Sequence, residues 1–189
     1  QVNKKISCLF LDRDGVINID YGYVHKIENF IFIKGVFKAL RILQELDYLL
    51  IIVTNQAGIA KSIFCESDLN LLHEHMNNEL KKEKIYLDGI YYCPHHIEGN
   101  NPTYSIKCNC RKPQPGMILN AINDFNIDLR NSILIGDKFS DILAGKNAKI
   151  PFTILLNSKY LNDSFHKTKP TVHCKDLLDA ANLINSLKK

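Results

Sequence analysis

The sequence predicts an α/β fold in which a parallel sheet carries helices on both faces. Short apolar runs alternate along the chain with stretches whose apolar residues recur at helical spacing. A continuous apolar run indicates a strand that is buried on both sides, and strands separated by helices favour parallel pairing. The chain has 189 residues, of which 46% are hydrophobic. That is enough for one domain, residues 1–189, to bury a core of its own.

The expected elements follow from the apolar spacing and from the residues that start or stop helices. Strands are expected at 6–11, 48–53, 90–93, 132–135 and 152–156. One helix begins at Gly35, a second takes Ser67 as its cap, a third is opened by Pro115, and the last runs from Leu177 to Leu187. Serine is a good helix cap, and proline suits a first helical position where no free amide is needed.

Charge and hydropathy exclude several classes of partner. The formal net charge of +4 is small and spread along the chain, which is a weak match to an anionic substrate. We interpret Lys81, Lys82 and Lys84 as a solvated helix face, since a nucleic-acid site needs more charge and exposed aromatic residues on one surface. No window approaches the run of ~20 apolar residues in a membrane span. We therefore expect no nucleic-acid or membrane partner, and a monomer.

The strongest chemical motif is Asp12-Arg13-Asp14-Gly15, directly after the first expected strand. Ligands of open α/β sheets bind at the carboxyl ends of the strands. A carboxylate can attack a phosphoryl group, and a second acid can manage the protons. Asp12 is therefore the expected nucleophile and Asp14 the general acid and base, with a divalent cation to neutralise the carboxylates. The alternative is a pair of aspartates that only cap a turn.

Two polar groups elsewhere fit the same phosphate chemistry. Thr54-Asn55-Gln56 follows the second expected strand, and a hydroxyl with adjacent amides can hold phosphate oxygens without adding negative charge. Arg111-Lys112-Pro113 precedes the helix opened by proline. Lys112 offers a point charge for the transferred phosphoryl group, and Arg111 offers a fork for a second oxyanion.

Gly136-Asp137-Lys138 ends the fourth expected strand, and Asp141 follows one helical turn later. We expect Asp137 to bind the cation and Asp141 to support it, because hard cations prefer oxygen ligands that are themselves held in place. Lys138 is expected to reach the substrate.

Taken together, Asp12-x-Asp14, Thr54, Lys112 and Gly136-Asp137-x-x-x-Asp141 resemble the haloacid dehalogenase superfamily of phosphatases over nearly the whole chain. The resemblance implies a Rossmann-like fold. It also implies Mg²⁺ bound by Asp12, the Asp14 backbone carbonyl and Asp137, with Thr54 and Lys112 stabilising the phosphoryl group. The intervals between the motifs hold no segment long enough for a folded cap domain. A capless member is therefore expected, with an open site covered by the loop at 20–25.

A second motif indicates a metal site of another kind. Two close pairs of soft or borderline ligands stand at Cys93-x-His95 and Cys108-x-Cys110. A closed Cys₃His set is typical of structural zinc, and such clustering favours metal over disulfides and a reducing, cytoplasmic setting. His96 is a rival ligand, but the Cys-x-His spacing matches the reach of Cys-x-Cys and favours His95. Zinc would then fix a long loop that ends at the basic pair 111–112.

With this loop the sequence resembles one branch of the superfamily more specifically. That branch removes the 7-phosphate of D-glycero-D-manno-heptose 1,7-bisphosphate in ADP-heptose and lipopolysaccharide core precursor synthesis. The resemblance implies that Arg111 recognises the phosphate that is kept. The expected substrate-binding residues are Arg13, Asp20, Tyr23, Asn55, Gln56, Arg111 and Lys138.

The chain departs from this branch at two positions, and two alternative functions stay open. Ala57 stands where the branch often has serine, and Ser62 where a glycine is expected, so the loop after the second strand is expected to differ in shape. A histidinol-phosphate phosphatase shares the motifs and the zinc loop, but a second cationic subsite favours a bisphosphate. The non-enzymatic alternative is a zinc-stabilised binding module whose acids only cap turns.

Overall fold

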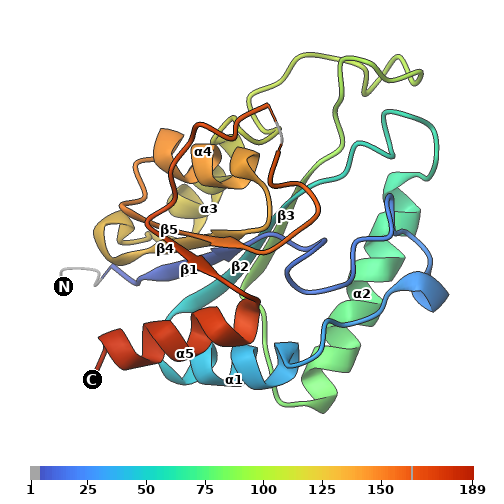
Figure 1. The fold of residues 1–189 in the computed structure, drawn as a ribbon. Helices are drawn as coiled ribbons and strands as arrows, with labels where there is room; N and C mark the ends of the chain where they lie inside the picture. The colour runs from blue at the N-terminus through green and yellow to red at the C-terminus, as the bar shows by residue number, and fades with distance from the viewer. Residues whose placement is uncertain (1–4, 163) are drawn as a thin grey trace.

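A computed structural model describes residues 5–162 and 164–189, in which a single six-stranded sheet has the order β3-β2-β1-β4-β5-β6 (Figure 1). Each strand pairs in parallel with its neighbour. The strands are β1 (Cys8–Leu11), β2 (Leu49–Asn55), β3 (Gly89–Cys93), β4 (Ile133–Gly136), β5 (Phe152–Leu156) and β6 (Val172–Cys174). The expected parallel α/β fold is confirmed.

Helices cover both faces of this sheet. They are α1 (Val36–Glu45), α2 (Glu66–Lys82), α3 (Gly116–Phe125), α4 (Phe139–Asn147) and α5 (Leu177–Leu187), with short 3₁₀ helices η1 (Ile27–Asn29) and η2 (Leu129–Asn131). Helices α1 and α5 lie below the sheet in Figure 1, and α3 and α4 lie above it. Each pair packs on its own apolar cluster, so the sheet separates two cores.

Alternation along the strands explains why the apolar runs are continuous. Leu9 and Leu11 belong to the core shared with α1 and α5, whereas Cys8 and Phe10 belong to the core shared with α3 and α4. Successive side chains of a strand point to opposite faces. Because both faces are covered, every position of β1 is buried, and no polar residue interrupts the pattern.

The structure corrects several local expectations. Helix α2 begins at Glu66 with Cys65 as its cap, because the Cys65 backbone N–H donates to the Asp68 carboxylate at 2.9 Å. Ser67 is therefore inside the helix. Pro115 is the residue before α3 rather than its first residue. Helix α4 and strand β6 were not expected, since α4 has a weak apolar pattern and β6 has only three residues, one of them exposed.

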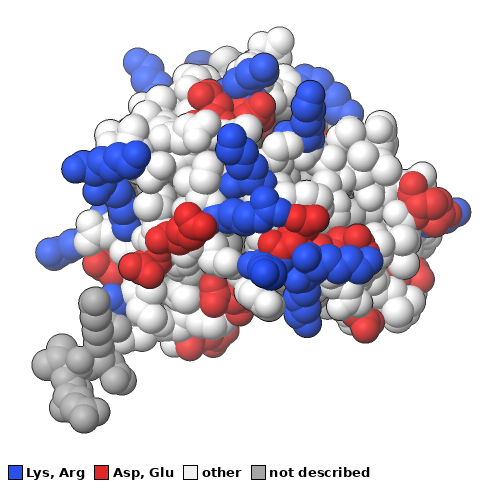
Figure 2. Space-filling view, turned by 90° about the horizontal axis from the view of Figure 1, so that it is seen from below, with Lys and Arg blue, Asp and Glu red and all other residues white. Residues whose placement is uncertain are grey.

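Figure 2 shows how charged side chains are distributed over one face of the molecule. Basic and acidic side chains are interspersed on the face on the side of α1 and α5 (Figure 2). This face has no extended basic patch of the kind that nucleic-acid binding requires. Within the described part of the chain, none of the helices is both long and apolar enough to cross a bilayer.

Candidate active site

Two central strands place a cluster of carboxylates at the carboxyl edge of the sheet. Asp12 follows β1 and Asp137 follows β4, and these strands are neighbours. The Asp12 backbone N–H donates to the Ile135 carbonyl at 3.1 Å, so the pairing continues to the site. Asp141 comes from the first turn of α4. Carboxylate oxygens of Asp12, Asp137 and Asp141 lie within 4.8 Å of one another, and all three residues are buried.

Lys112 brings a buried cation into this cluster. Its Nζ lies 3.0 Å from Asp12 Oδ1 and 2.6 Å from Asp141 Oδ1, and it donates to the Val53 carbonyl at 2.7 Å. Burial opposes the charge, but the Asp12 and Asp141 carboxylates raise the pKa of Lys112, so it stays cationic. The side chain of Asn55 clamps the backbone of Lys112, accepting from its N–H at 2.9 Å and donating to its carbonyl at 3.1 Å.

The cluster still has more negative charge than its partners neutralise. Burial, with the nearby Asp12 and Asp141 carboxylates, raises the pKa of Asp137 to about 9. Asp137 Oδ1 is buried and has no hydrogen-bond partner among the described residues. Asp141 differs, since its oxygens accept from Lys112 Nζ at 2.6 Å and from the Lys138 N–H at 3.0 Å. The oxygens of Asp12 and Asp137 therefore fit a hard divalent cation, with Asp141 as support.

The absence of a side chain at Gly15 makes room for the Asp137 carboxylate. It has a φ of +82°, and an added Cβ would lie 2.1 Å from Asp137 Oδ2. A side chain at this position would thus collide with the candidate cation ligand and strain the backbone.

The Asp14 carboxyl lies at the pocket and is held by three side chains. Its Oδ1 accepts from Arg13 at 2.9 Å and from Asn18 at 2.9 Å, while its Oδ2 accepts from Gln56 at 3.1 Å. Gln56 also donates to Thr54 Oγ1 at 2.9 Å. The general acid expected from the sequence is therefore placed by neighbours that fix both of its oxygens.

Arg13 does not lie where the sequence analysis expected it. Its side chain is fully buried, and its guanidinium contacts Asp14, the Val24 carbonyl at 2.9 Å and the His73 ring at 3.1 Å. It also lies over the Phe30 ring. The structure thus does not bring the Arg13 side chain to the pocket with the other expected substrate-binding residues: it is buried, it contacts the Asp14 carboxylate, and it is absent from the pocket lining.

A pocket of about 880 Å³ opens beside the carboxylates. It brings together every other residue that was expected to bind substrate: Asp20, Tyr23, Asn55, Gln56, Arg111 and Lys138. Its lining also includes Lys61, His96 and Tyr160, which the sequence analysis missed. Lys61 and Tyr160 belong to no motif used in the sequence analysis, and His96 was considered there only as a rival metal ligand. Each reaches the pocket through loop folding.

The cover of the pocket is larger than the loop at 20–25. Lys61, on the loop after β2, donates to the Tyr23 hydroxyl at 3.0 Å, and the loop that follows β3 contributes His96 and Arg111. Ser62 has a φ of 56°, in the left-handed region. Glycine adopts this conformation more readily than serine, which explains why a glycine was expected at this position.

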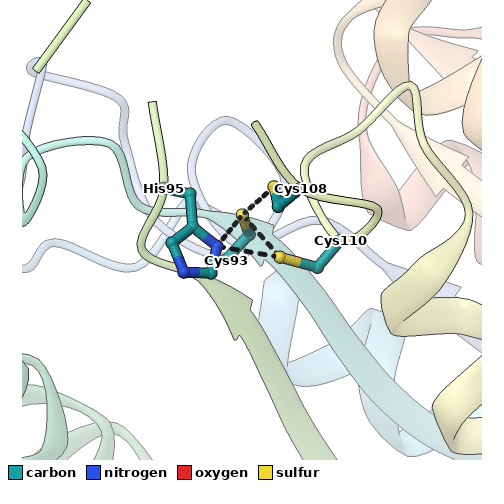
Figure 3. A group of neighbouring side chains, drawn as sticks. All are labelled: Cys93, His95, Cys108 and Cys110. Atoms are coloured by element: carbon teal, nitrogen blue, oxygen red, sulfur yellow. Dashed lines mark hydrogen bonds between the residues drawn. The ribbon is translucent and has the colours of Figure 1, made fainter. Parts of the chain in front are cut away.

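The four expected soft ligands come together at the end of β3 (Figure 3). Cys93 Sγ lies 3.7 Å from His95 Nδ1 and 3.6 Å from Cys108 Sγ, and His95 Nδ1 lies 3.3 Å from Cys110 Sγ. The Cys93 and Cys110 sulfurs are closer, at 2.9 Å. Bonds of ~2.0–2.3 Å in a tetrahedral site separate ligand atoms by roughly 3.3–3.8 Å, so most of these spacings fit such a metal site.

The structure also distinguishes the two neighbouring histidines, His95 and His96. The His96 ring lines the pocket, and its Nδ1 accepts from the Glu98 N–H at 3.0 Å. His95 is therefore the histidine of the cluster, as the spacing favoured.

Comparison with known proteins places this site in a family. The HAD-hydrolase-like family model matches residues 109–180. The D-glycero-beta-D-manno-heptose-1,7-bisphosphate 7-phosphatase of Pasteurella multocida (strain Pm70) is 47% identical over 182 residues, which cover 96% of this chain and 98% of that protein. The chain belongs to this phosphatase family.

Other members of the family agree. The enzyme of the same name from Escherichia coli (strain K12) is 44% identical over 155 residues, which cover 82% of this chain and 81% of that protein. The crystal structure of D,D-heptose 1,7-bisphosphate phosphatase from B. bronchiseptica, complexed with magnesium and phosphate, has a TM-score of 0.80 at 28% identity. It matches 96% of this chain and 99% of its own. The expected superfamily and branch are confirmed.

Proposed function

We propose that the protein hydrolyses the 7-phosphate of D-glycero-D-manno-heptose 1,7-bisphosphate, a step in ADP-heptose and lipopolysaccharide core precursor synthesis. The observation that carries the proposal is one pocket with two separate cationic points, Lys112 at the carboxylates and Arg111 on the wall. Arg111 Nη1 is buried without a hydrogen-bond partner among the described residues. A guanidinium nitrogen that has no partner in the pocket wall suits the phosphate that is kept.

The proposed reaction has two in-line steps. The Asp12 carboxylate attacks phosphorus, and the bond from phosphorus to the C7 oxygen breaks while Asp14 donates a proton to that oxygen. Thr54 and Lys112 hold oxygens of the transferring group. An aspartyl-phosphate results. Asp14 then takes a proton from water, which attacks the same phosphorus, so that inorganic phosphate leaves and Asp12 is restored.

We propose that Mg²⁺ is held by Asp12, the Asp14 backbone carbonyl and Asp137. The unpartnered Oδ1 and raised pKa of Asp137 support this assignment. When bound, the ion neutralises the carboxylates and polarises the phosphoryl oxygens.

We further propose that zinc is held by Cys93, His95, Cys108 and Cys110, and that its role is structural. The segment from Cys110 leads directly into Arg111 and Lys112. A metal that fixes this segment would hold both proposed phosphate-binding cations in place.

The remaining proposals concern the whole protein. Residues 1–189 are proposed to act as a single domain and as a monomer in the cytoplasm, with no nucleic-acid or membrane partner. One continuous sheet through the described residues supports the single domain, and cysteines that form no disulfides support a reducing, cytoplasmic setting. Sedimentation at working concentration tests the monomer, and a dimer mass would contradict it.

The function is tested by phosphate release with Mg²⁺ from both anomers of the heptose bisphosphate, from histidinol phosphate and from fructose 1,6-bisphosphate. We expect the highest kcat/KM with one heptose anomer. A preference for histidinol phosphate would keep the chemistry and overturn the substrate. No release from any of them would overturn the enzymatic proposal.

A variant sharpens this test. Arg111→Met should raise KM for the bisphosphate by roughly 10- to 100-fold, the value of a charge-assisted hydrogen bond. The matched control is heptose 7-phosphate, which lacks the second phosphate and should respond little. An equal rise for both substrates would place Arg111 at the cleaved phosphate instead.

A further inference from the structure

The segment after β5 ties together three neighbouring loops at the carboxyl edge of the sheet. Ser158 Oγ donates to the Asp137 carbonyl at 2.6 Å and accepts from the Tyr160 N–H at 3.0 Å. Lys159 Nζ donates to the Asp20 carbonyl at 3.2 Å. Residues 158–160 therefore connect the segments that follow β4 and β1, which are successive neighbours of β5 in the sheet.

Tyr160 places its ring against a cation of the pocket. Lys138 Nζ lies 4.3 Å from the centroid of the Tyr160 ring and 3.6 Å from Asp20 Oδ2. The Tyr160 hydroxyl lies close enough to the Asp20 carboxylate to help lower the pKa of Asp20, after the backbone N–H of Gly22. The ammonium of Lys138 is thus held between an aromatic face and a carboxylate, and its ion pair among the described residues is with Asp20 rather than with a carboxylate of the cluster.

The carboxylate cluster also attracts the Lys138 ammonium. Lys138 follows Asp137 in the chain, and its own backbone N–H bonds to Asp141 at 3.0 Å. Burial lowers the pKa of Lys138, but the surrounding carboxylates, Asp12 first among them, raise it more. A lysine ammonium on a flexible four-carbon stem can reach several partners. Inside the cluster it would pair with the proposed nucleophile and compete with a divalent cation for the same oxygens.

We propose that Tyr160 is a positioning residue, which holds the Lys138 ammonium on the substrate side of the pocket and keeps it out of the carboxylate cluster. The ring supplies a cation–π contact and the hydroxyl fixes Asp20, the counter-charge on the same side. The inference rests on the proposed function, in that Asp12 and Asp137 are taken to bind Mg²⁺ and Lys138 to contact substrate.

The test measures Mg²⁺ binding by calorimetry without substrate, on the full-length, zinc-loaded protein. Tyr160→Leu should weaken Mg²⁺ binding by roughly three- to thirtyfold, the range that a cation–π contact is worth. Tyr160→Phe keeps the aromatic ring and should therefore lose less Mg²⁺ affinity than Tyr160→Leu. KM for the bisphosphate should rise in the same order. Tyr86→Leu is the matched control, since Tyr86 is 57% exposed and outside the pocket.

A second substitution separates positioning from a general structural role. Lys138→Met in the Tyr160→Leu background removes the competing ammonium, so Mg²⁺ affinity should return to the wild-type value or above it. A structural defect would persist in the double variant, and that result overturns the inference. Unchanged Mg²⁺ affinity in Tyr160→Leu overturns it as well. Wild-type protein that binds no Mg²⁺ or releases no phosphate would instead overturn the proposed function.

Discussion

At the scale of single residues, Lys112 sets the charge of the site. One ammonium is shared by Asp12 and Asp141, whereas Asp137 forms no ion pair with a described residue. A buried ion pair loses much of its value when one partner is removed, because the other charge is then uncompensated. Here the loss of one carboxylate does not leave the Lys112 charge unpaired, since the other carboxylate still pairs with it.

This sharing makes the nucleophile testable. Asp12→Asn should lower kcat by at least about 10³-fold, because an amide cannot form the covalent intermediate. Lys112 keeps Asp141 as its partner, so the thermal midpoint should stay close to that of the wild type. Phosphate release and circular dichroism measure the two effects. Substantial residual turnover would contradict the covalent mechanism.

Ser62 offers a second prediction at this scale. Its φ of 56° lies in the left-handed region, which costs a residue with a Cβ roughly 1–2 kcal/mol. Ser62→Gly should therefore raise the free energy of unfolding by about 1 kcal/mol in urea titrations. Ser62→Ala, the matched control, removes the same hydroxyl but keeps the strain and should give no gain. If Ser62→Gly and Ser62→Ala changed the free energy of unfolding equally, backbone strain at Ser62 would not be the cause.

At the scale of elements, two loops over the pocket are fastened to each other. The Ala60 carbonyl, in the loop after β2, accepts from the N–H groups of Asn100 and Asn101, both at 2.9 Å. The Glu66 carboxylate, at the start of α2, accepts from the hydroxyls of Tyr92 and Tyr104, both at 2.7 Å. Disorder in the Cys/His loop should therefore spread to the loop that carries Lys61.

The Cys/His loop should consequently affect stability and substrate binding together. Cys110→Ser, or removal of the metal by a chelator, should lower the free energy of unfolding by about 3 kcal/mol or more and raise KM. Cys65→Ser is the control, because Cys65 is exposed and serine caps a helix well, so its effect should stay within about 0.5 kcal/mol. If chelation changed neither quantity, the cluster would not be a structural metal site.

At the scale of the whole molecule, the carboxylate cluster links stability to pH and to Mg²⁺. Burial and neighbouring carboxylates raise the pKa of Asp137 to about 9, whereas an unfolded aspartate has a pKa of ~3.9. Between pH 6 and pH 8 the folded state therefore binds more protons than the unfolded state. The free energy of unfolding then falls as pH rises, by up to about 1.4 kcal/mol per pH unit.

Without divalent cations, the free energy of unfolding of the wild-type protein should accordingly fall between pH 6 and pH 8. The fall should be smaller in Asp137→Asn, which lacks the titrating carboxyl group. Adding Mg²⁺ should stabilise the wild type more at pH 8, by about 2.7 kcal/mol at 100 times its Kd, and should not stabilise Asp137→Asn. Burial lowers the pKa of His73 to about 3, so this histidine stays neutral in the folded state across the window. Parallel pH profiles of the two proteins would contradict the assignment.

The sequence by itself determined the fold class and the chemical groups of the site. Continuous apolar runs such as the one ending at Leu11 report burial on both faces, because a strand between two helical layers has no solvated side. The motifs at Asp12, Thr54 and Asp137 directly follow strands, and in a parallel sheet all carboxyl ends lie at one edge. The convergence of these three residues could therefore be predicted without coordinates, whereas Lys112 reaches the site from the long loop before α3.

Only the tertiary structure decided which way individual side chains point. Arg13 faces away from the pocket, and His95 rather than His96 joins the cysteines. Spacing along the chain favoured His95, but it does not fix the direction in which neighbouring side chains point. Helix α4 and strand β6 are held by packing more than by local pattern. Tyr160 reaches Asp20, 140 residues earlier in the chain, only because β5 and β1 lie close in the sheet.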